Sequence, residues 1–209
     1  MRVLLVNPPS RFILKDKLGI IGIPLGLAYL AAFLEKWDHE VRIIDAPAVE
    51  SGFEDIEKEI VKFSPGIVGV TATTSNIYDA YKVAQIAKMV KREILVVAGG
   101  PHVTFTAKQT LQECPFIDVI VRGEGEETFQ EIVNFFQSSS GNYKFLEKIS
   151  GITYRLAGKI VENKPRFFIK NLDSIPFPAY HLLPMEHYNL KGKRFGNVMT
   201  SRGCPFSCI

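Results

Sequence analysis

Short apolar runs alternate with longer stretches of helical periodicity along the first two thirds of the chain. The apolar runs are rich in β-branched residues and nearly free of polar side chains; they are VLLV from Val3, VRII from Val41, IVGVT from Ile67, ILVVA from Ile94 and VIV from Val119. Strands with no polar face are typical of a parallel sheet that helices cover on both sides. The runs therefore predict five buried parallel strands.

A stretch of helical periodicity follows each apolar run and predicts the covering helices. These stretches span residues 25–37, 53–63, 77–90, 106–113 and 127–136. The crossovers are long enough for right-handed βαβ units. We therefore predict an α/β domain over residues 1–137, built on a doubly wound five-stranded parallel sheet of the flavodoxin-like or Rossmann-like type.

The pattern changes after residue 137. The polar SSSGN over residues 138–142 interrupts it, and ITYRLAGKIVENK then predicts a β-hairpin that turns at Ala157-Gly158. Prolines at positions 176, 178 and 184 exclude a regular element in the segment that follows. We predict a hairpin and an extended proline-rich linker over residues 138–195, and the beginning of a further domain over residues 196–209.

Composition and charge exclude several classes of protein. The 209 residues carry 25 Lys and Arg against 22 Asp and Glu, and the net charge of +3 is interspersed along the chain, which argues against a nucleic-acid partner. The uncharged run over residues 18–34 is just short of a membrane span and contains Pro24, and no signal-peptide pattern opens the sequence. Three cysteines cannot form a disulfide framework. We predict a cytoplasmic protein with neither a membrane nor a nucleic-acid partner.

The loops that follow the predicted strands hold the candidate binding residues, because ligands of open parallel sheets bind beyond the carboxyl ends of the strands. These loops are rich in Gly, Pro and hydroxyl side chains, which allow a ligand to approach the backbone. The candidate lining residues are Asn7, Pro8 and Pro9; Thr73, Thr74 and Ser75; Gly99, Gly100, Pro101 and His102; and Gly123, Glu124, Gly125 and Glu126. The first loop lacks G-x-G-x-x-G, which argues against a dinucleotide and weakens a ribose-binding role for Asp45.

Each candidate also has a purely structural interpretation. The prolines after Asn7 could form a rigid turn, and a hydroxyl or the Asn76 amide of TATTSN could cap a helix. The acidic run over residues 123–127 could favour the positive end of the next helix, and His102 could be a hydrogen-bonding loop residue. The paired glycines have the stronger functional claim, because glycines weaken a strand unless something must come close to it.

The cysteines fall into two groups. Cys204 and Cys208 lie close together in TSRGCPFSC, whereas Cys114 lies in a predicted helix-to-strand connection. We expect Cys114 to be structural, and His39 to serve the turn before the second strand. Thiolates bind iron and zinc, but a tetrahedral site needs three or four ligands and the terminal pair supplies two. The pair therefore predicts an incomplete metal site.

Taken in order, these segments resemble the N-terminal part of cobalamin-binding radical S-adenosylmethionine proteins, a family that includes corrinoid-dependent methylases and the anaerobic oxidative cyclase of bacteriochlorophyll synthesis. The resemblance covers essentially all residues and rests on VLLVNPP, VRIID, GVTATTSN, VVAGGPH, VIVRGEGEET, GITYRLAGKIVENKPR, LDSIPFPAY and TSRGCPFSC. The C-x3-C-x2-C motif of this family binds a 4Fe-4S cluster that chelates S-adenosylmethionine. Cys204 and Cys208 match its first two cysteines, and the third would fall at position 211, beyond the sequence.

The resemblance implies a full-length radical enzyme that catalyses methyl transfer or radical cyclisation. Cobalamin would be the cofactor of these residues, while the 4Fe-4S cluster and S-adenosylmethionine would belong to the full-length protein. The missing radical barrel would then be the partner of this part of the chain. We expect these residues to bind the corrinoid without catalysis and without a stable cluster.

The resemblance also implies how the corrinoid is held. Many cobalamin domains carry D-x-H-x-x-G after the first strand, but no histidine occurs here from Asn7 to Gly26. This departure implies a displaced, buried dimethylbenzimidazole tail and no protein ligand on cobalt. Residues 7–9 would lie near the corrin, residues 73–75 with Gly99-Gly100 along the tail, and residues 123–126 at the rim.

Two other functions fit the same residues. A stand-alone flavodoxin-like module for a small molecule would make the terminal cysteines incidental, but it gives no role to the hairpin and linker that lead to them. A radical S-adenosylmethionine protein whose domain has lost its corrinoid would keep the whole pattern. The spectrum of a bound cofactor distinguishes these alternatives.

Overall fold

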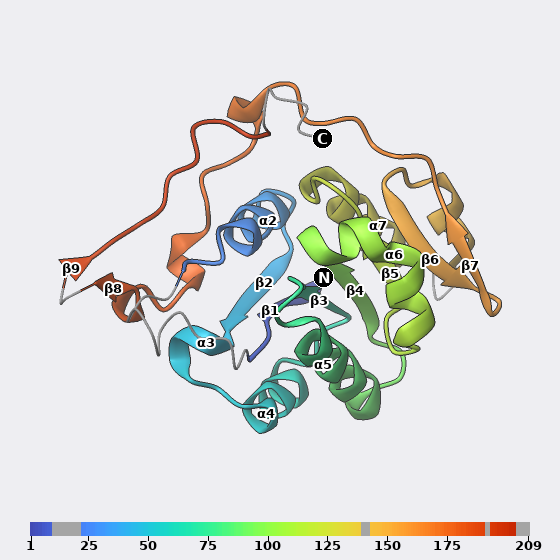
Figure 1. Ribbon diagram of the computed structural model, residues 1–209, viewed down its shortest axis with the longest axis horizontal. Helices are drawn as coiled ribbons and strands as arrows, with labels where there is room; N and C mark the ends of the chain where they lie inside the picture. Colours follow the sequence, from blue (N-terminus) through green and yellow to red (C-terminus); the bar gives the residue numbers. More distant parts are fainter. Residues whose placement is uncertain (10–21, 139–142, 191–192, 204–209) are drawn as a thin grey trace.

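The computed structural model describes residues 1–9, 22–138, 143–190 and 193–203. Within them a seven-stranded sheet forms the centre of the molecule, and helices cover its two faces (Figure 1). The strands of this sheet are β1 (Arg2–Asn7), β2 (Glu40–Asp45), β3 (Ile67–Thr71), β4 (Leu95–Gly99), β5 (Val119–Val121), β6 (Ile152–Leu156) and β7 (Lys159–Glu162). The α-helices are α2 (Leu25–Glu35), α3 (Ala46–Val49), α4 (Phe53–Phe63), α5 (Ile77–Val90), α6 (Pro101–Glu113) and α7 (Glu126–Ser138).

The first five strands are parallel, which confirms the predicted α/β fold. Their order in the sheet, β2-β1-β3-β4-β5, is the flavodoxin-like order. The chain places β2 on one side of β1 and then crosses to place β3 on the other side. The strand order therefore reverses between β1 and β3, and the loops diverge there at the carboxyl ends of the strands.

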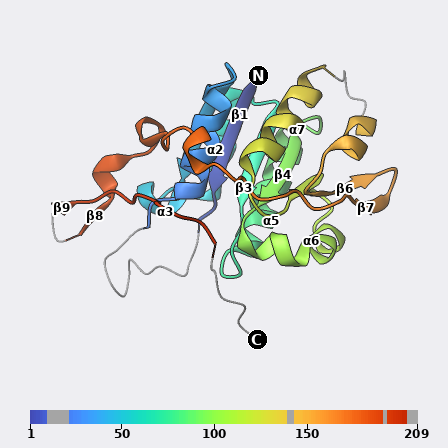
Figure 2. The same cartoon turned by 90° about the horizontal axis from the view of Figure 1, so that it is seen from above.

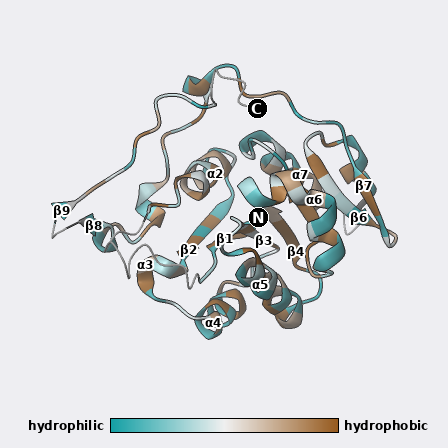
Figure 3. Ribbon diagram, in the orientation of Figure 1, coloured by the Kyte–Doolittle hydropathy of each residue, from teal (hydrophilic) through white to brown (hydrophobic). Residues whose placement is uncertain are grey.

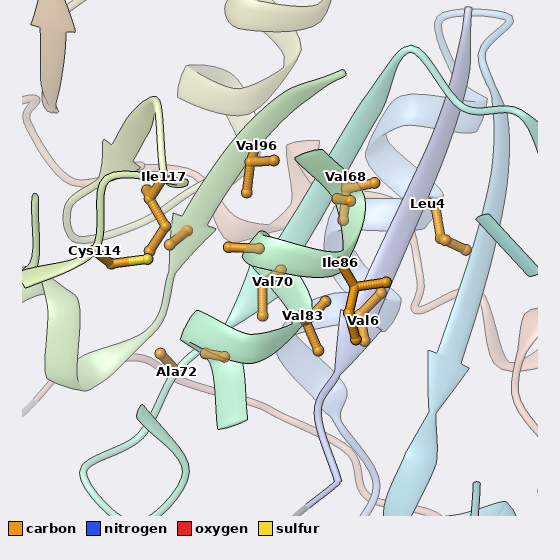
Figure 4. Packing of buried hydrophobic residues seen from close by; sticks show 14 of the residues in the cluster. Leu4, Val6, Val68, Val70, Ala72, Val83, Ile86, Val96, Cys114 and Ile117 are labelled. Carbon is orange, nitrogen blue, oxygen red and sulfur yellow. The ribbon is translucent and has the colours of Figure 1, made fainter. Parts of the chain in front are cut away.

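Successive residues of each strand point to opposite faces of the sheet and build two cores. Leu4 and Val6 of β1 pack with residues of α4, α5 and α6 on one face, where Figure 4 shows side chains of β1, β3 and β4 meeting those of α5. Leu5 of β1 and Val97 of β4 pack with α2 and α7 on the other face. Cys114 belongs to the first core, and burial raises the pKa of its thiol, which agrees with a structural role.

The hydropathy of the elements follows this layered arrangement. Figure 3 shows hydrophobic central strands, with hydrophilic residues on the outer parts of the surrounding helices. Among the described residues, no helix is both long enough and apolar enough to cross a membrane.

Helix α6 corrects the sequence prediction. We predicted that it begins at about Thr106, but it begins at Pro101, directly after Gly100. Proline suits the first helical turn because the amide hydrogen that it lacks would have no partner there. Thr106 has a non-helical conformation inside the helix, and its hydroxyl donates a 2.9 Å hydrogen bond to the carbonyl of His102. The helical pattern is therefore interrupted at Thr106, and its first turn carries Pro101 and His102.

The predicted hairpin is present and belongs to the same sheet. Strand β6 pairs antiparallel with β5, and β7 pairs antiparallel with β6. Ala157 and Gly158 form the turn with φ angles of 49° and 79°, the positive values that a tight two-residue hairpin turn requires. Tyr154 of β6 is fully buried in the core that faces α2 and α7. The hairpin thus extends the core, while the domain boundaries at residues 137 and 195 stay predictions.

After β7 the chain runs along the side of the molecule where α7 and α2 lie, and it then returns toward the C-terminus (Figures 1 and 2). In the described part of this segment, the regular structure consists of short 3₁₀ turns and the two-stranded pair β8 (Asn189–Leu190) and β9 (Lys193–Arg194). The amide of Ala179 donates a 3.0 Å hydrogen bond to the carbonyl of Ala28 in α2. Leu183 and Tyr188 are buried against Ala28 and its neighbours in a third, smaller core. The segment after the hairpin is therefore packed against the domain.

Candidate functional site

A cavity of about 290 Å³ lies at the carboxyl ends of the strands, on the face that α2 and α7 cover. It lies at the reversal of strand order, where open α/β sheets bind their ligands. Strands β1, β3, β4 and β5, helix α2, the start of α7 and the C-terminal segment all contribute to it. The lining residues are Leu5, Gly26, Leu27, Tyr29, Leu30, Gly69, Val70, Thr71, Val97, Gly99, Gly100, Val121, Gly123, Glu124, Gly125, Glu126, Phe129, Met199 and Arg202.

Two glycines of the sheet lie at this cavity, and they differ in the space around them. Gly69 of β3 lies beside Leu5 of β1 in the strand register, and Gly99 of β4 lies beside Thr71 of β3. A methyl group at Gly69 would come within 2.8 Å of the Leu5 side chain, whereas one at Gly99 would meet nothing closer than the Val121 carbonyl at 4.0 Å. A side chain at Gly99 would therefore enter the cavity without colliding with the backbone.

Gly100 has a second reason to be glycine. Its φ angle is 104°, and a Cβ atom there would lie 2.7 Å from the carbonyl oxygen of Ala72 and 3.0 Å from its nitrogen. The loops after β3 and β4 are held this close by hydrogen bonds, since the Ala72 amide donates to the Gly99 carbonyl and the His102 amide donates to the Ala72 carbonyl. The paired glycines thus differ, because Gly99 opens the cavity and Gly100 also permits the contact between the two loops.

The predicted residues after β3 lie beside the cavity and do not line it. The amide and hydroxyl of Thr73 donate to Oδ1 of Asn76 at 2.7 and 3.0 Å, and Oγ1 of Thr73 lies 3.0 Å from Oγ of Ser75. Asn76 occupies the N-cap position of α5, so the predicted cap falls on the amide of the TATTSN segment and not on one of its hydroxyls. Thr74 Oγ1 lies 3.1 Å from Nδ1 of His102, which joins this loop to the first turn of α6.

The residues after β1 join a buried polar cluster. The side-chain amide of Asn7 donates a 2.7 Å hydrogen bond to Oδ1 of Asp45, and the Tyr188 hydroxyl donates a 2.6 Å bond to Oδ2. Burial raises the pKa of Asp45, and these two hydrogen bonds oppose the rise. Pro8 is buried and Pro9 is half-buried next to this cluster in the chain. Asn7 therefore orients the end of β1 and is not a lining residue of the cavity.

The acidic loop after β5 contributes directly to the cavity wall. Gly123, Glu124, Gly125 and Glu126 all line it, so this part of the predicted set is brought together with Gly99 and Gly100. The carboxylates also bind the C-terminal segment, since Arg202 lies 2.6 Å from Glu126 and 3.5 Å from Glu124. Glu126 stands in the first turn of α7, where an acidic residue also complements the helix dipole. The helix-dipole interpretation of the acidic run therefore applies to Glu126, while a ligand-binding role of this loop stays a prediction.

Three residues of the site carried no signal in the sequence. Tyr29 and Arg202 line the cavity, and Tyr188 donates to Asp45. Tyr188 is 143 positions from Asp45, and Arg202 is 76 positions from Glu126. No local spacing could reveal these contacts, because the long C-terminal segment creates them.

The predicted metal ligands Cys204 and Cys208 lie outside the described residues. Within the described part of the chain, no group of three His, Cys, Asp or Glu side chains could hold a metal ion. His39 is buried, and its Nε2 lies 3.1 Å from Oδ1 of Asn134 in α7. Burial is the main cause that lowers the pKa of His39, which agrees with its predicted structural role.

A flavodoxin-like sheet with an apolar cavity at its reversal point defines a ligand-binding α/β domain. The chain belongs to the B12-binding domain family, because the family model described as B12 binding domain matches residues 13–133. The resemblance to cobalamin-dependent radical S-adenosylmethionine proteins is confirmed in the same comparisons.

The similar proteins are longer than this chain. It is 51% identical over 209 residues to the uncharacterized methyltransferase PH0819 of Pyrococcus horikoshii, covering all of this chain and 44% of that protein. It is 36% identical over 192 residues to the anaerobic magnesium-protoporphyrin IX monomethyl ester cyclase of Rubrivivax gelatinosus, covering 88% of this chain and 34% of the cyclase. The chain thus spans less than half of either relative.

A solved structure supports the fold. The cobalamin-dependent S-adenosylmethionine radical enzyme OxsB, with aqua-cobalamin and S-adenosylmethionine bound, superposes with a TM-score of 0.71 at 19% identity. The match covers 87% of this chain and 24% of the OxsB chain. At this level of identity the likeness establishes the shared architecture, including the hairpin-extended sheet.

Proposed function

We propose that this domain binds cobalamin, with the dimethylbenzimidazole tail of the cofactor inserted into the cavity between α2 and α7. The observation that carries the proposal is the open space at Gly99, in a cavity at the reversal of strand order of a B12-binding domain. A displaced tail needs a site next to the sheet that accepts a flat aromatic group. A glycine in the strand at this site leaves the space for such a group, because it has no side chain.

The cavity has properties that suit such a group. Its wall is mainly apolar, with Leu5, Val97 and Phe129 among the lining residues, so burying an aromatic ring there is favourable. Its volume of about 290 Å³ lies near the lower end of the range of ligand sites, about 300–1,000 Å³. The corrin ring is larger than the space between the helices, and we place it over the loops that follow β1, β3 and β4. Asn7 makes a hydrogen bond at the end of β1, and Thr74 and His102 join the loops that follow β3 and β4.

The domain would act within a larger radical enzyme. Bound cobalamin supplies a methyl group in methyl transfer, and this chain would hold the cofactor, orient it and exclude water from its tail. The 4Fe-4S cluster and S-adenosylmethionine would be bound by the remainder of the protein, with Cys204 and Cys208 as the first two cluster ligands. Methyl transfer and radical cyclisation are both consistent with the relatives, since one is a methyltransferase and the other a cyclase.

An absorbance titration tests the proposal. Hydroxocobalamin and cob(II)alamin are added separately to the protein, and a base-off spectrum is expected because the tail leaves the cobalt. Gly99→Leu fills the cavity and should weaken binding at least about tenfold. Gly196→Leu is the control, because a Cβ at Gly196 meets nothing within 4 Å and this residue does not line the cavity.

The outcomes separate the parts of the proposal. Folded protein that binds neither corrinoid would overturn the assignment of cobalamin and favour a domain that has lost its cofactor. Equal binding by Gly99→Leu and Gly196→Leu would overturn the placement of the tail, as would a base-on spectrum. Gly100 is unsuitable for this test, because a side chain there collides with the backbone of Ala72 whether or not a ligand binds.

A further inference from the structure

The C-terminal segment supplies part of the cavity wall. Residues 197–203, here called the closing segment, follow β9 and run toward the C-terminus on the α2 side of the molecule (Figure 1). Met199 and Arg202 of this segment line the same cavity as Tyr29 of α2. Arg202 stands two positions before Cys204, the first cysteine of the terminal motif. The segment that leads to this motif is therefore also a wall of the ligand site.

Arg202 holds the closing segment in place. Its Nη2 atom lies 2.6 Å from Oε1 of Glu126, its Nη1 atom lies 3.5 Å from Oε1 of Glu124, and its guanidinium carbon lies 5.2 Å from the centre of the Tyr29 ring. The side chains of Arg202 and Glu124 are each 17% exposed and that of Glu126 is 7% exposed. Such partly buried, charge-assisted contacts are stronger than exposed ion pairs. All four of these side chains line the cavity.

A second arginine makes a similar contact away from the cavity. Arg166 lies 3.1 Å from Glu127 and 2.5 Å from Glu131, both on α7, and its side chain is 18% exposed. It therefore resembles Arg202 in burial and in the number of its carboxylate partners. Arg166 does not contribute to the cavity wall. A substitution of Arg166 therefore serves as the control: it removes ion pairs to acidic residues of α7 without changing the cavity wall.

We infer that Arg202 is a positioning residue that couples occupancy of the cavity to docking of the closing segment. This inference rests on the proposed function for the identity of the ligand. A ligand in the cavity contacts the wall formed by Met199 and Arg202 only when the segment is docked, so it binds the docked state more tightly. A filled cavity also excludes water from the ion pairs and strengthens them. By thermodynamic linkage, docking of the closing segment increases the affinity for the ligand by the same factor by which the bound ligand increases the docking equilibrium constant.

Dissociation kinetics of the 209-residue protein test the coupling. Hydroxocobalamin is bound first, and its release after dilution is followed by absorbance in the wild type, Arg202→Gln and Arg166→Gln. We expect Arg202→Gln to accelerate release about tenfold and Arg166→Gln to change it less than about twofold. Equal acceleration by the two single variants would overturn the inference.

Proteolysis of the ligand-free protein separates this inference from the proposed function. Thermolysin cleaves before apolar residues, so cleavage before Met199, which lines the cavity, reports on docking of the closing segment. Val198 is exposed even when the segment is docked. Cleavage before Met199 should be faster in Arg202→Gln than in the wild type or Arg166→Gln. If the wild type binds no corrinoid, the proposed function fails and this assay alone judges the docking role of Arg202. Unchanged cleavage in Arg202→Gln would overturn that role.

Discussion

Removing the hydroxyl of Tyr188 perturbs the buried contact between the C-terminal segment and the strand ends. In Tyr188→Phe, Oδ2 of Asp45 loses a 2.6 Å hydrogen bond while Oδ1 keeps its 2.7 Å bond from Asn7. Tyr188 is fully buried and Asp45 is 1% exposed, so water cannot readily replace the lost donor. Losing a hydrogen bond to a buried charged group costs about 1–3 kcal/mol. We expect a loss of about 2 kcal/mol, which lowers the Tm of a chain of this size by about 4–8 °C.

The loss should depend on pH, because Asp45 titrates. Burial raises the pKa of Asp45 above its ordinary value of 3.8, and the hydrogen bond from Tyr188 opposes that rise. A carboxyl whose folded pKa is raised contributes stability that is complete below the unfolded pKa and is lost as the pH rises through the folded pKa. Without the Tyr188 hydroxyl the folded pKa rises further. The difference in stability between wild type and variant therefore grows as the pH rises through the raised folded pKa of Asp45.

Urea unfolding, followed by circular dichroism at about pH 4.5 and about pH 7.5, measures both effects. The control is Tyr180→Phe, which removes an exposed hydrogen bond from the Tyr180 hydroxyl to the Asn197 carbonyl and should change stability by less than about 0.5 kcal/mol. An equal loss at the two pH values would refute the assigned role of the Asp45 carboxylate. A loss in Tyr180→Phe as large as that in Tyr188→Phe would refute the claim that burial sets the magnitude.

Two further predictions concern the backbone at the site and a buried histidine. Gly100→Ala should destabilise the fold by at least about 3 kcal/mol, because its Cβ would clash with the backbone of Ala72. Gly123 also has a positive φ, but a Cβ there meets nothing within 4 Å, so Gly123→Ala should cost about 1 kcal/mol. Denaturant titration measures both losses of stability, and equal losses would contradict the clash with Ala72. Because burial lowers the pKa of His39 below 6.5, its contribution to stability is present above pH 6.5 and is lost as the pH falls below that value. His39→Gln should remove this part of the acid sensitivity, and parallel stability curves from about pH 7.5 to about pH 5 for the two proteins would contradict the assignment.

Much of the fold was determined by local sequence alone. The apolar runs became the five parallel strands because a strand buried on both faces cannot carry polar side chains. The hairpin turn was readable at Ala157-Gly158, where a tight turn needs positive φ angles. The beginning of α6 was not readable, because Thr106 leaves the helical conformation within an otherwise helical pattern.

The candidate site was readable only in part. Gly99 and the glycines of the acidic loop could be predicted from the sequence, because the strand ends of an open sheet form its ligand site and a glycine there lets a ligand approach the backbone closely. A helix cap was predicted among the hydroxyls and the amide of TATTSN, and Asn76 of that segment occupies the N-cap position. The pairing of the hydroxyls with one another and with His102 depends on how two loops meet in space.

The tertiary structure alone decided which residues close the site. Tyr188 reaches Asp45 across 143 positions, and Arg202 reaches Glu126 across 76 positions. Contacts at such separations follow no local periodicity, since they are formed when the C-terminal segment packs against α2 and α7. Apolar patterning specifies the strands and helices because those depend on neighbouring residues. The cavity wall depends instead on where the irregular C-terminal segment packs, because its partly buried Arg202 must pair with carboxylates that lie far away in the sequence.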